Sequence, residues 1–120
     1  MEVNEANYQR FNEKGKYSSY YRTEANSIIF DVSLIKDVNF IKQNTLIDED
    51  PGAPKLIIFR NQAIYYNQLL SEKVFAKLAN CLVAGGYLAI GVKETLENTN
   101  VSNKFTLYNE AERIYKRKTN

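Results

Sequence analysis

The sequence predicts an α/β fold with a central strand–helix–strand unit, a C-terminal antiparallel hairpin and an N-terminal β-hairpin. Three observations lead to this prediction. Two continuous apolar runs, at 56–59 and 87–92, are typical of strands covered on both faces, as in a parallel sheet. Between them, apolar residues recur at the spacing of one helix face. Toward both ends of the chain, pairs of short runs rich in β-forming residues flank polar turns, which indicates hairpins.

The N-terminal part is expected to form a lead-in followed by a hairpin subdomain. It begins with a polar stretch that allows a short helix near Asn4–Phe11. The hairpin strands are expected at Tyr17–Arg22 and Ser27–Val32, because a short polar turn separates two runs of β-forming residues. We therefore place a first domain at 1–36 and a second domain at 37–120.

The second domain is expected to begin with a strand at Val38–Ile41. An acidic loop that contains two prolines and a glycine follows at Asp48–Pro54. The apolar run at 56–59 then predicts the next strand, and the run at 87–92 predicts its parallel neighbour. A parallel pair requires a crossover, which should be right-handed.

The crossover is expected to be a helix that starts after Asn67, since an asparagine side chain can cap the first turn. The apolar positions of its buried face are Leu70, Val74, Phe75, Leu78, Ala79 and Leu82. Gly85 and Gly86 are predicted to end it. At the end of the chain, the runs Lys104–Tyr108 and Arg113–Arg117 predict the C-terminal hairpin.

The composition excludes several classes of function. The chain has 120 residues, a net charge of +2, one cysteine and no histidine. Without histidine there is no Ser-His-Asp or Cys-His catalysis and no histidine metal site, and we expect no metal. No apolar run approaches the roughly 20 residues of a membrane span, so we expect no membrane insertion. The balanced charge argues against nucleic-acid binding, and the lone Cys81 fits a cytoplasmic protein.

Polar residues follow three of the predicted strands, at the edge where open parallel sheets bind ligands. These junctions are Asn44 with Thr45, Arg60 with Asn61, and the segment Gly91–Glu94. Asparagine and arginine can recognise polar groups of a ligand. Spacing alone favours the plainer interpretation, in which the two asparagines only cap turns.

Three segments, in order along the chain, add a more specific pattern. The first, Ile58–Tyr66, contains Arg-Asn and then Ile-Tyr-Tyr; the second, 85–96, reads Gly-Gly-Tyr-Leu-Ala-Ile-Gly-Val-Lys-Glu-Thr-Leu. The third is Ile114–Arg117. Together they resemble the CheR-type chemotaxis receptor methyltransferases, which carry R-N-V-x-I-Y-F after one strand and G-G-Y-L-x-x-G-x-x-E-x-L on the next. The upstream segment 44–46 is similar to the N-L-L step of that family.

The resemblance implies a partial Rossmann-like methyltransferase sheet and S-adenosylmethionine as the cofactor. These enzymes methylate glutamate side chains of chemoreceptors, so a chemoreceptor or another protein is the implied substrate. By the same resemblance, Asn44 and Thr45 lie near the adenine of the cofactor, and Arg60 and Asn61 line the cofactor pocket. Tyr65 matches a family tyrosine beside the methyl-transfer centre and is the implied catalytic residue.

The family's glycine-rich cofactor loop is missing from this sequence. The five glycines are Gly15, Gly52, Gly85, Gly86 and Gly91, and none follows a strand and opens a helix. We therefore expect the C-terminal part of a catalytic domain, inactive alone. In the family's sheet the missing strands separate 38–41 from 56–59, so two strand edges lose their partners. We expect a homo-oligomer formed through these edges, or a sheet in which the two strands pair directly.

Two other functions are considered. The segment 17–32 matches a small antiparallel subdomain that grips the receptor's C-terminal tail in some family members. A non-catalytic module that binds a peptide through this hairpin is therefore the alternative, although the hairpin could simply cover the main sheet. The basic tail Tyr108–Lys118 suggests nucleic-acid binding, but Glu110 and Glu112 dilute its charge and we do not favour it.

Overall fold

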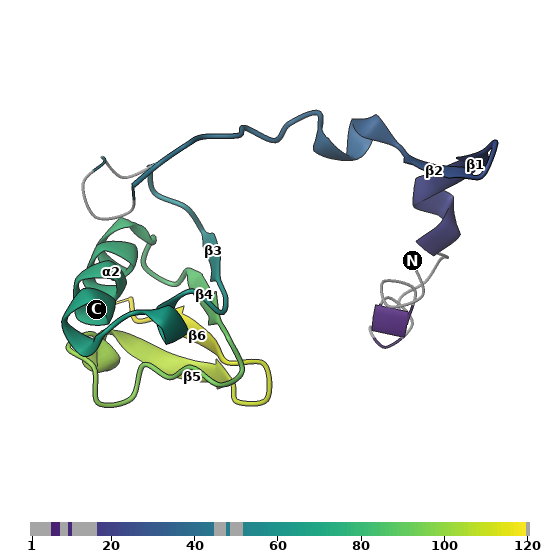
Figure 1. The fold of residues 1–120 in the computed structure, drawn as a ribbon. Helices are drawn as coiled ribbons and strands as arrows, with labels where there is room; N and C mark the ends of the chain where they lie inside the picture. Colours follow the sequence, from purple (N-terminus) through teal and green to yellow (C-terminus); the bar gives the residue numbers. More distant parts are fainter. Residues whose placement is uncertain (1–5, 8–9, 11–16, 45–47, 49–51, 120) are drawn as a thin grey trace. The chain divides into compact units, whose positions relative to one another are not determined.

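The computed structural model describes residues 6–7, 10, 17–44, 48 and 52–119. The chain divides into two compact units, residues 1–42 and 43–120 (Figure 1). The first unit contains a two-stranded sheet and the second a four-stranded sheet, so the expected α/β class is confirmed. Where a short helix is expected near the N-terminus, Ala6, Asn7 and Arg10 are helical; the other residues of 4–11 lie outside the described residues.

The hairpin of the first unit is confirmed. Its strands, β1 (Tyr21–Glu24) and β2 (Ser27–Phe30), pair in antiparallel orientation. The two residues between them, Ala25 and Asn26, have φ angles of 41° and 67°. Left-handed conformations at both central positions are those of a type I′ turn, whose twist matches that of the paired strands. A two-residue type I′ turn therefore connects the two strands of the hairpin.

The first strand begins four residues later than predicted. Tyr17–Tyr20 form a 3-10 helix, so the expectation that the strand starts at Tyr17 is wrong. The pairing ends at Tyr21 with Phe30, and the chain beyond β2 turns into a second 3-10 helix, Val32–Ile35. One further backbone hydrogen bond, from the N–H of Asp31 to the carbonyl oxygen of Tyr20 at 2.9 Å, lies beyond this pair, and both segments then continue as 3-10 helices.

The strand predicted at Val38–Ile41 is also wrong. Residues 38–44 have no regular secondary structure, and Phe40 and Ile41 are 82% and 66% exposed. Neither sheet of the described residues includes this segment. A strand forms only when its backbone finds a neighbour, and no described strand pairs with it.

The second unit is built on one mixed sheet with the order β3-β4-β6-β5. Its strands are β3 (Leu56–Phe59), β4 (Tyr87–Ile90), β5 (Phe105–Asn109) and β6 (Ile114–Arg117). Strands β3 and β4 are parallel, whereas β6 is antiparallel to both β4 and β5. The strand–helix–strand unit and the C-terminal hairpin are confirmed. Short 3-10 helices lie at Ala63–Tyr65 and Ser102–Lys104.

The crossover helix α2 (Gln68–Cys81) begins as predicted, because Asn67 Oδ1 accepts a 2.9 Å hydrogen bond from the N–H of Leu70. It ends before the glycine pair. Leu82 is extended, with φ −64° and ψ 133°, and is fully buried. The helix therefore stops where Leu82 enters the core, and the prediction that the glycines end it is wrong.

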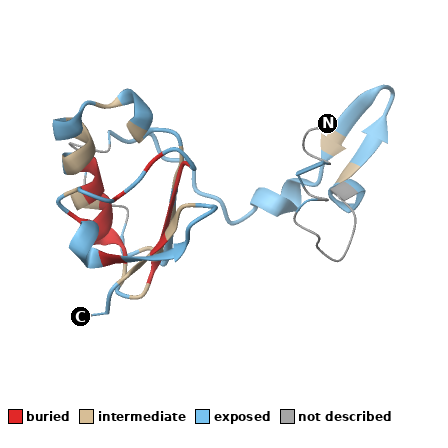
Figure 2. Ribbon diagram, turned by 90° about the horizontal axis from the view of Figure 1, so that it is seen from below, coloured by how far each residue is buried: buried red, intermediate tan, exposed pale blue. Residues whose placement is uncertain are grey.

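One hydrophobic core lies between α2 and the sheet (Figure 2). From the helix it includes Val74, Phe75 and Leu78, and from the sheet Leu88, Ile90 and Tyr115. Strand β4 is buried along 88–90. Strand β3 is covered on one face only, since Ile57 and Phe59 pack against the core while Leu56 and Ile58 are 56% and 69% exposed. The expectation of full burial is thus confirmed for β4 and wrong for β3, which is an edge strand.

Candidate functional site

The ends of β3 and β4 meet the turn before β6 at one edge of the sheet. Arg60 and Asn61 follow β3, and Gly91 follows β4. The N–H of Ile90 donates to the carbonyl oxygen of Arg113 at 3.1 Å, which fixes the β5–β6 turn at the same edge. This carboxyl edge, where parallel strands end, is where open α/β sheets bind their ligands.

A buried carboxylate joins the ends of the two parallel strands. Oε1 of Glu94 accepts hydrogen bonds from the N–H of Asn61 at 2.8 Å and from the N–H of Gly91 at 2.7 Å. Glu94 is only 7% exposed, and its Oε2 has no hydrogen-bond partner among the described residues. Hydrogen bonds to an ionised acceptor are roughly twice as strong as neutral ones. Glu94 therefore holds the end of β3 to the end of β4 at the carboxyl edge.

Asn61 and Gly91 approach each other too closely for a larger residue at 91. Asn61 has φ 59°, a left-handed conformation that asparagine adopts more readily than most residues. A Cβ atom at Gly91 would lie 2.3 Å from Oδ1 of Asn61 and 2.6 Å from Oε1 of Glu94. The Asn61 side chain thus lies over Gly91, so this asparagine has a structural role at the strand end.

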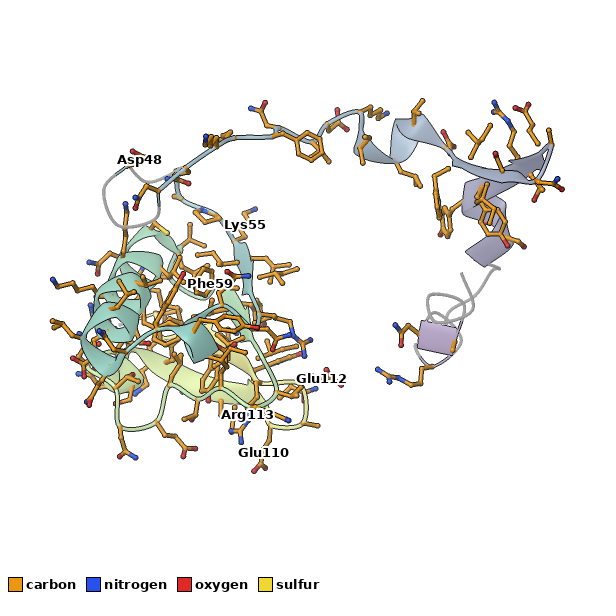
Figure 3. The ribbon with its side chains drawn as sticks, viewed as in Figure 1. Asp48, Lys55, Phe59, Glu110, Glu112 and Arg113 are labelled. Carbon is orange, nitrogen blue, oxygen red and sulfur yellow. The ribbon has the colours of Figure 1, made fainter. Side chains whose placement is uncertain are left out.

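Arg60 is held toward the β5–β6 turn. Its guanidinium lies 3.6 Å from Oε2 of Glu112, and both side chains are partly exposed. Figure 3 shows Glu112 and Arg113 together at this end of the unit. A partly exposed ion pair of this kind contributes little to stability, so Arg60 can exchange Glu112 for an anionic or polar ligand group.

Tyr65 lies near these residues in the chain, on the short 3-10 helix that follows Asn61. Its side chain is 82% exposed, whereas that of its neighbour Tyr66 packs against Phe59 with ring centroids 6.5 Å apart. Of the two tyrosines, Tyr65 is the one that faces solvent. Its ring and hydroxyl are accessible to a partner molecule.

Of the other two predicted cofactor residues, Asn44 is not part of this cluster. The N–H of Asn44 donates to Oδ2 of Asp48 at 2.6 Å, and the carbonyl oxygen of Asp48 accepts from Nζ of Lys77. Figure 3 shows Asp48 and Lys55 toward the end of the unit where β3 begins, away from Glu112 and Arg113. Asn44 thus lies toward the opposite end of β3 from Asn61. Thr45 lies outside the described residues.

A small pocket of about 240 Å³ lies beside the Glu94 carboxylate. It is lined by Ala63, Ile64, Ser71, Phe75, Lys93, Glu94, Thr95 and Thr99. These residues come from the turn after β3, from α2 and from the loop after β4. Among the described residues, no group of three acidic or cysteine side chains could hold a metal ion, and no helix is long and apolar enough to span a membrane.

The chain matches the model of a known protein family over most of its length. Residues 2–113 match the model of the CheR methyltransferase, SAM binding domain. The chain belongs to the CheR methyltransferase family. It is also 26% identical over 117 residues to the "Putative methyltransferase Cher3" of Pseudomonas putida. That alignment covers 98% of this chain and 43% of the relative, so the chain spans less than half of the relative's length.

S-adenosylmethionine is the cofactor of the CheR SAM-binding domain. The described residues of this CheR chain fit one wall of a site for it. Arg60 offers donors to polar groups and Tyr65 offers an exposed ring, while the buried Oε2 of Glu94 is an unused acceptor at the same edge. A glycine turn between a strand and a helix, which would let the cofactor approach the backbone, is absent from the described residues.

The sequence predicts three junctions at the carboxyl edge, and two of them, Arg60 with Asn61 and Gly91–Glu94, lie there, whereas Asn44 does not. The sequence alone predicts no role for Glu94. The signal was present, because Gly91–Glu94 was one of those junctions and the acid belongs to the G-x-x-E pattern. The link from Glu94 to Asn61 spans 33 residues and is visible only in the folded chain.

Proposed function

We propose that this chain contributes one wall of the cofactor and substrate site of a CheR-type protein-glutamate methyltransferase. One observation carries the proposal. The residues that follow β3 and those that follow β4, which belong to two separate family motifs, are joined by the Glu94 hydrogen bonds at the sheet's carboxyl edge. Arg60 and Asn61 would contact the cofactor, and the exposed Tyr65 would face the transferred methyl group.

The proposed chemistry suits a chain without histidine. When bound, S-adenosylmethionine supplies a methyl group on a positively charged sulfur. A glutamate carboxylate is already ionised near neutral pH, so it needs no general base to become a nucleophile. The protein's task is then to orient the carboxylate and the methyl group. Tyr65, exposed beside the carboxyl edge, is suited to that task.

We further propose that the chain alone does not transfer methyl groups. Support comes from its glycines. Gly85 has φ +77° and lies between α2 and β4, while Gly91 is enclosed by Asn61 and Glu94. Both positions therefore serve the fold, and neither cradles a cofactor. The opposite wall of the site would come from another segment or another chain, with a chemoreceptor or other protein as the substrate and the cytoplasm as the location.

Titration with S-adenosylmethionine and S-adenosylhomocysteine tests this proposal. By calorimetry we expect no binding of the isolated chain in the micromolar range. At millimolar S-adenosylhomocysteine we expect NMR shifts at the backbone amides of 60–65, and Arg60→Ala should abolish them. Arg22→Ala, in the first unit, is the matched control and should change nothing. Micromolar binding would contradict the inactivity, and shifts confined to other residues would contradict the site.

The open edge of β3 supports a homo-oligomer, which we propose as the state of the isolated chain. The strand has no neighbour on one side among the described residues, and Leu56 and Ile58 are exposed on its outer face. Unpaired strand edges pair readily with other chains, and charged residues oppose such pairing. Ile58→Lys should therefore shift sedimentation toward the monomer, whereas Leu107→Lys on the opposite edge strand should not. A wild-type monomer at high concentration would contradict this proposal.

The second candidate is a peptide-binding module built on the N-terminal hairpin. A groove of about 450 Å³ favours it, lined by Ser19, Tyr20, Tyr21, Arg22, Ile29, Phe30, Asp31 and Val32. Hydrogen bonds from Ser33 hold the pKa of Asp31 below its usual value, so the groove presents a carboxylate near neutral pH. A pull-down with receptor tails should weaken in the Tyr20→Ala, Tyr21→Ala variant. Equal binding by Tyr108→Ala and the wild type is the control, and equal binding by the double variant would exclude the hairpin.

A further inference from the structure

Glu94 makes two side-chain hydrogen bonds within the carboxyl edge, and its backbone makes a third. Its own N–H donates to the carbonyl oxygen of Gly91 at 2.9 Å, while its Oε1 accepts from the N–H of the same glycine at 2.7 Å. The turn from Gly91 to Glu94 is therefore closed by two reciprocal hydrogen bonds. The same Oε1 reaches Asn61 on the neighbouring strand end.

The hydrogen bond to Asn61 acts on an unusual backbone conformation. A residue with φ near +59° is held there at a cost, because left-handed conformations are disfavoured for residues with a Cβ. The N–H of Asn61 would otherwise be left without an acceptor at a partly buried position. The Glu94 carboxylate therefore stabilises the direction in which the chain leaves β3. That direction determines where the following 3-10 helix, which carries Tyr65, lies.

We propose that Glu94 is a positioning residue of this site, which holds Asn61 left-handed and so places the following segment, with Tyr65, toward the bound ligand. The inference rests on the proposed function for the identity of that ligand. It assigns Glu94 no contact with the reacting atoms. Length should matter more than charge, because a single Oε1 must reach two N–H groups on different strand ends. Gly91 completes the arrangement, since a larger residue there would occupy the space of Oε1.

Backbone NMR on Glu94 variants tests the inference without any cofactor. In Glu94→Leu the two N–H groups lose their acceptor, and we expect hydrogen exchange at Asn61 and Gly91 to accelerate about 10- to 100-fold. The three-bond coupling that reports φ should also change at Asn61. Amides of the core, such as that of Ile90, should exchange at their wild-type rates. Glu97→Leu, an exposed acid in the same loop, is the matched control and should leave all of these values unchanged.

Two conservative variants keep the test decisive even where Glu94→Leu does not fold. Glu94→Gln retains a neutral acceptor at the same reach, and we expect exchange at both amides to stay within a few-fold of wild type. Glu94→Asp keeps the charge but is one methylene shorter, and it should behave like the leucine variant. Wild-type exchange and coupling at Asn61 in Glu94→Asp would overturn the inference, and so would the same result in Glu94→Leu where that variant folds. A failed cofactor titration would count against the proposed function alone.

Discussion

Strands β3 and β4 have similar apolar sequences, lie side by side in parallel, and yet differ in burial. On the outer face of the sheet, Ala89 of β4 is only 8% exposed, whereas its partner Ile58 in β3 is 69% exposed. The difference arises from neighbours, because β4 has a strand on each side and β3 has one. An apolar run therefore indicates that a strand can be buried on both faces, whereas its position in the sheet determines how much of its surface is buried.

The largest expected effect comes from truncating a core-face side chain of β4, compared with an outer-face side chain of β3. Leu88→Ala removes a fully buried side chain from the core and should lower the free energy of unfolding by about 2–5 kcal/mol. Ile58→Ala removes a side chain that is 69% exposed and should cost less than about 1 kcal/mol. Urea unfolding of both variants checks the difference. Similar losses would mean that β3 is covered in solution by another chain or segment.

A smaller effect is expected where the two strands end. Gly91→Ala places a Cβ within 2.3 Å of Asn61 Oδ1, and the resulting overpacking should cost about 1–3 kcal/mol. Val92→Ala, at the exposed neighbouring position, is the control and should be close to neutral. Thermal unfolding measures both. A neutral Gly91→Ala would show that the ends of β3 and β4 are not closely joined.

The smallest effect concerns the connection between the two strands. Asn67→Ala removes the side-chain acceptor that caps α2 and should cost about 1 kcal/mol. Asn67→Asp keeps an acceptor and should be nearly neutral, which separates capping from other effects of the substitution. Urea unfolding is again the measurement. An equal loss in both variants would contradict the capping role.

Much of this architecture follows from local sequence signals. Asn67 caps α2 as its side chain predicts, and the hairpins at both ends form where polar turns separate β-forming runs. These features depend on contacts between residues close in the chain. The carboxyl edge was predictable for the same reason, because polar residues directly follow β3 and β4.

The remaining features depend on partners that the sequence does not specify locally. The segment 38–41 has the composition of a strand but forms none, because no described strand pairs with it. Tyr17–Tyr20 form a 3-10 helix where the opposite segment, after Asp31, turns into a 3-10 helix of its own. The sequence predicts that Asn44 lies at the same sheet edge as Asn61, but Asn44 lies toward the opposite end of β3.

The space around Gly91 also limits how this family of sequences can change. Its Cα lies against the side chains of Asn61 and Glu94, which come from different motifs. A homologue with a larger residue at this position would need a compensating change at one of the other two. Substitutions at these three positions should therefore be correlated among homologues, and a single replacement should be tolerated less often than a paired one.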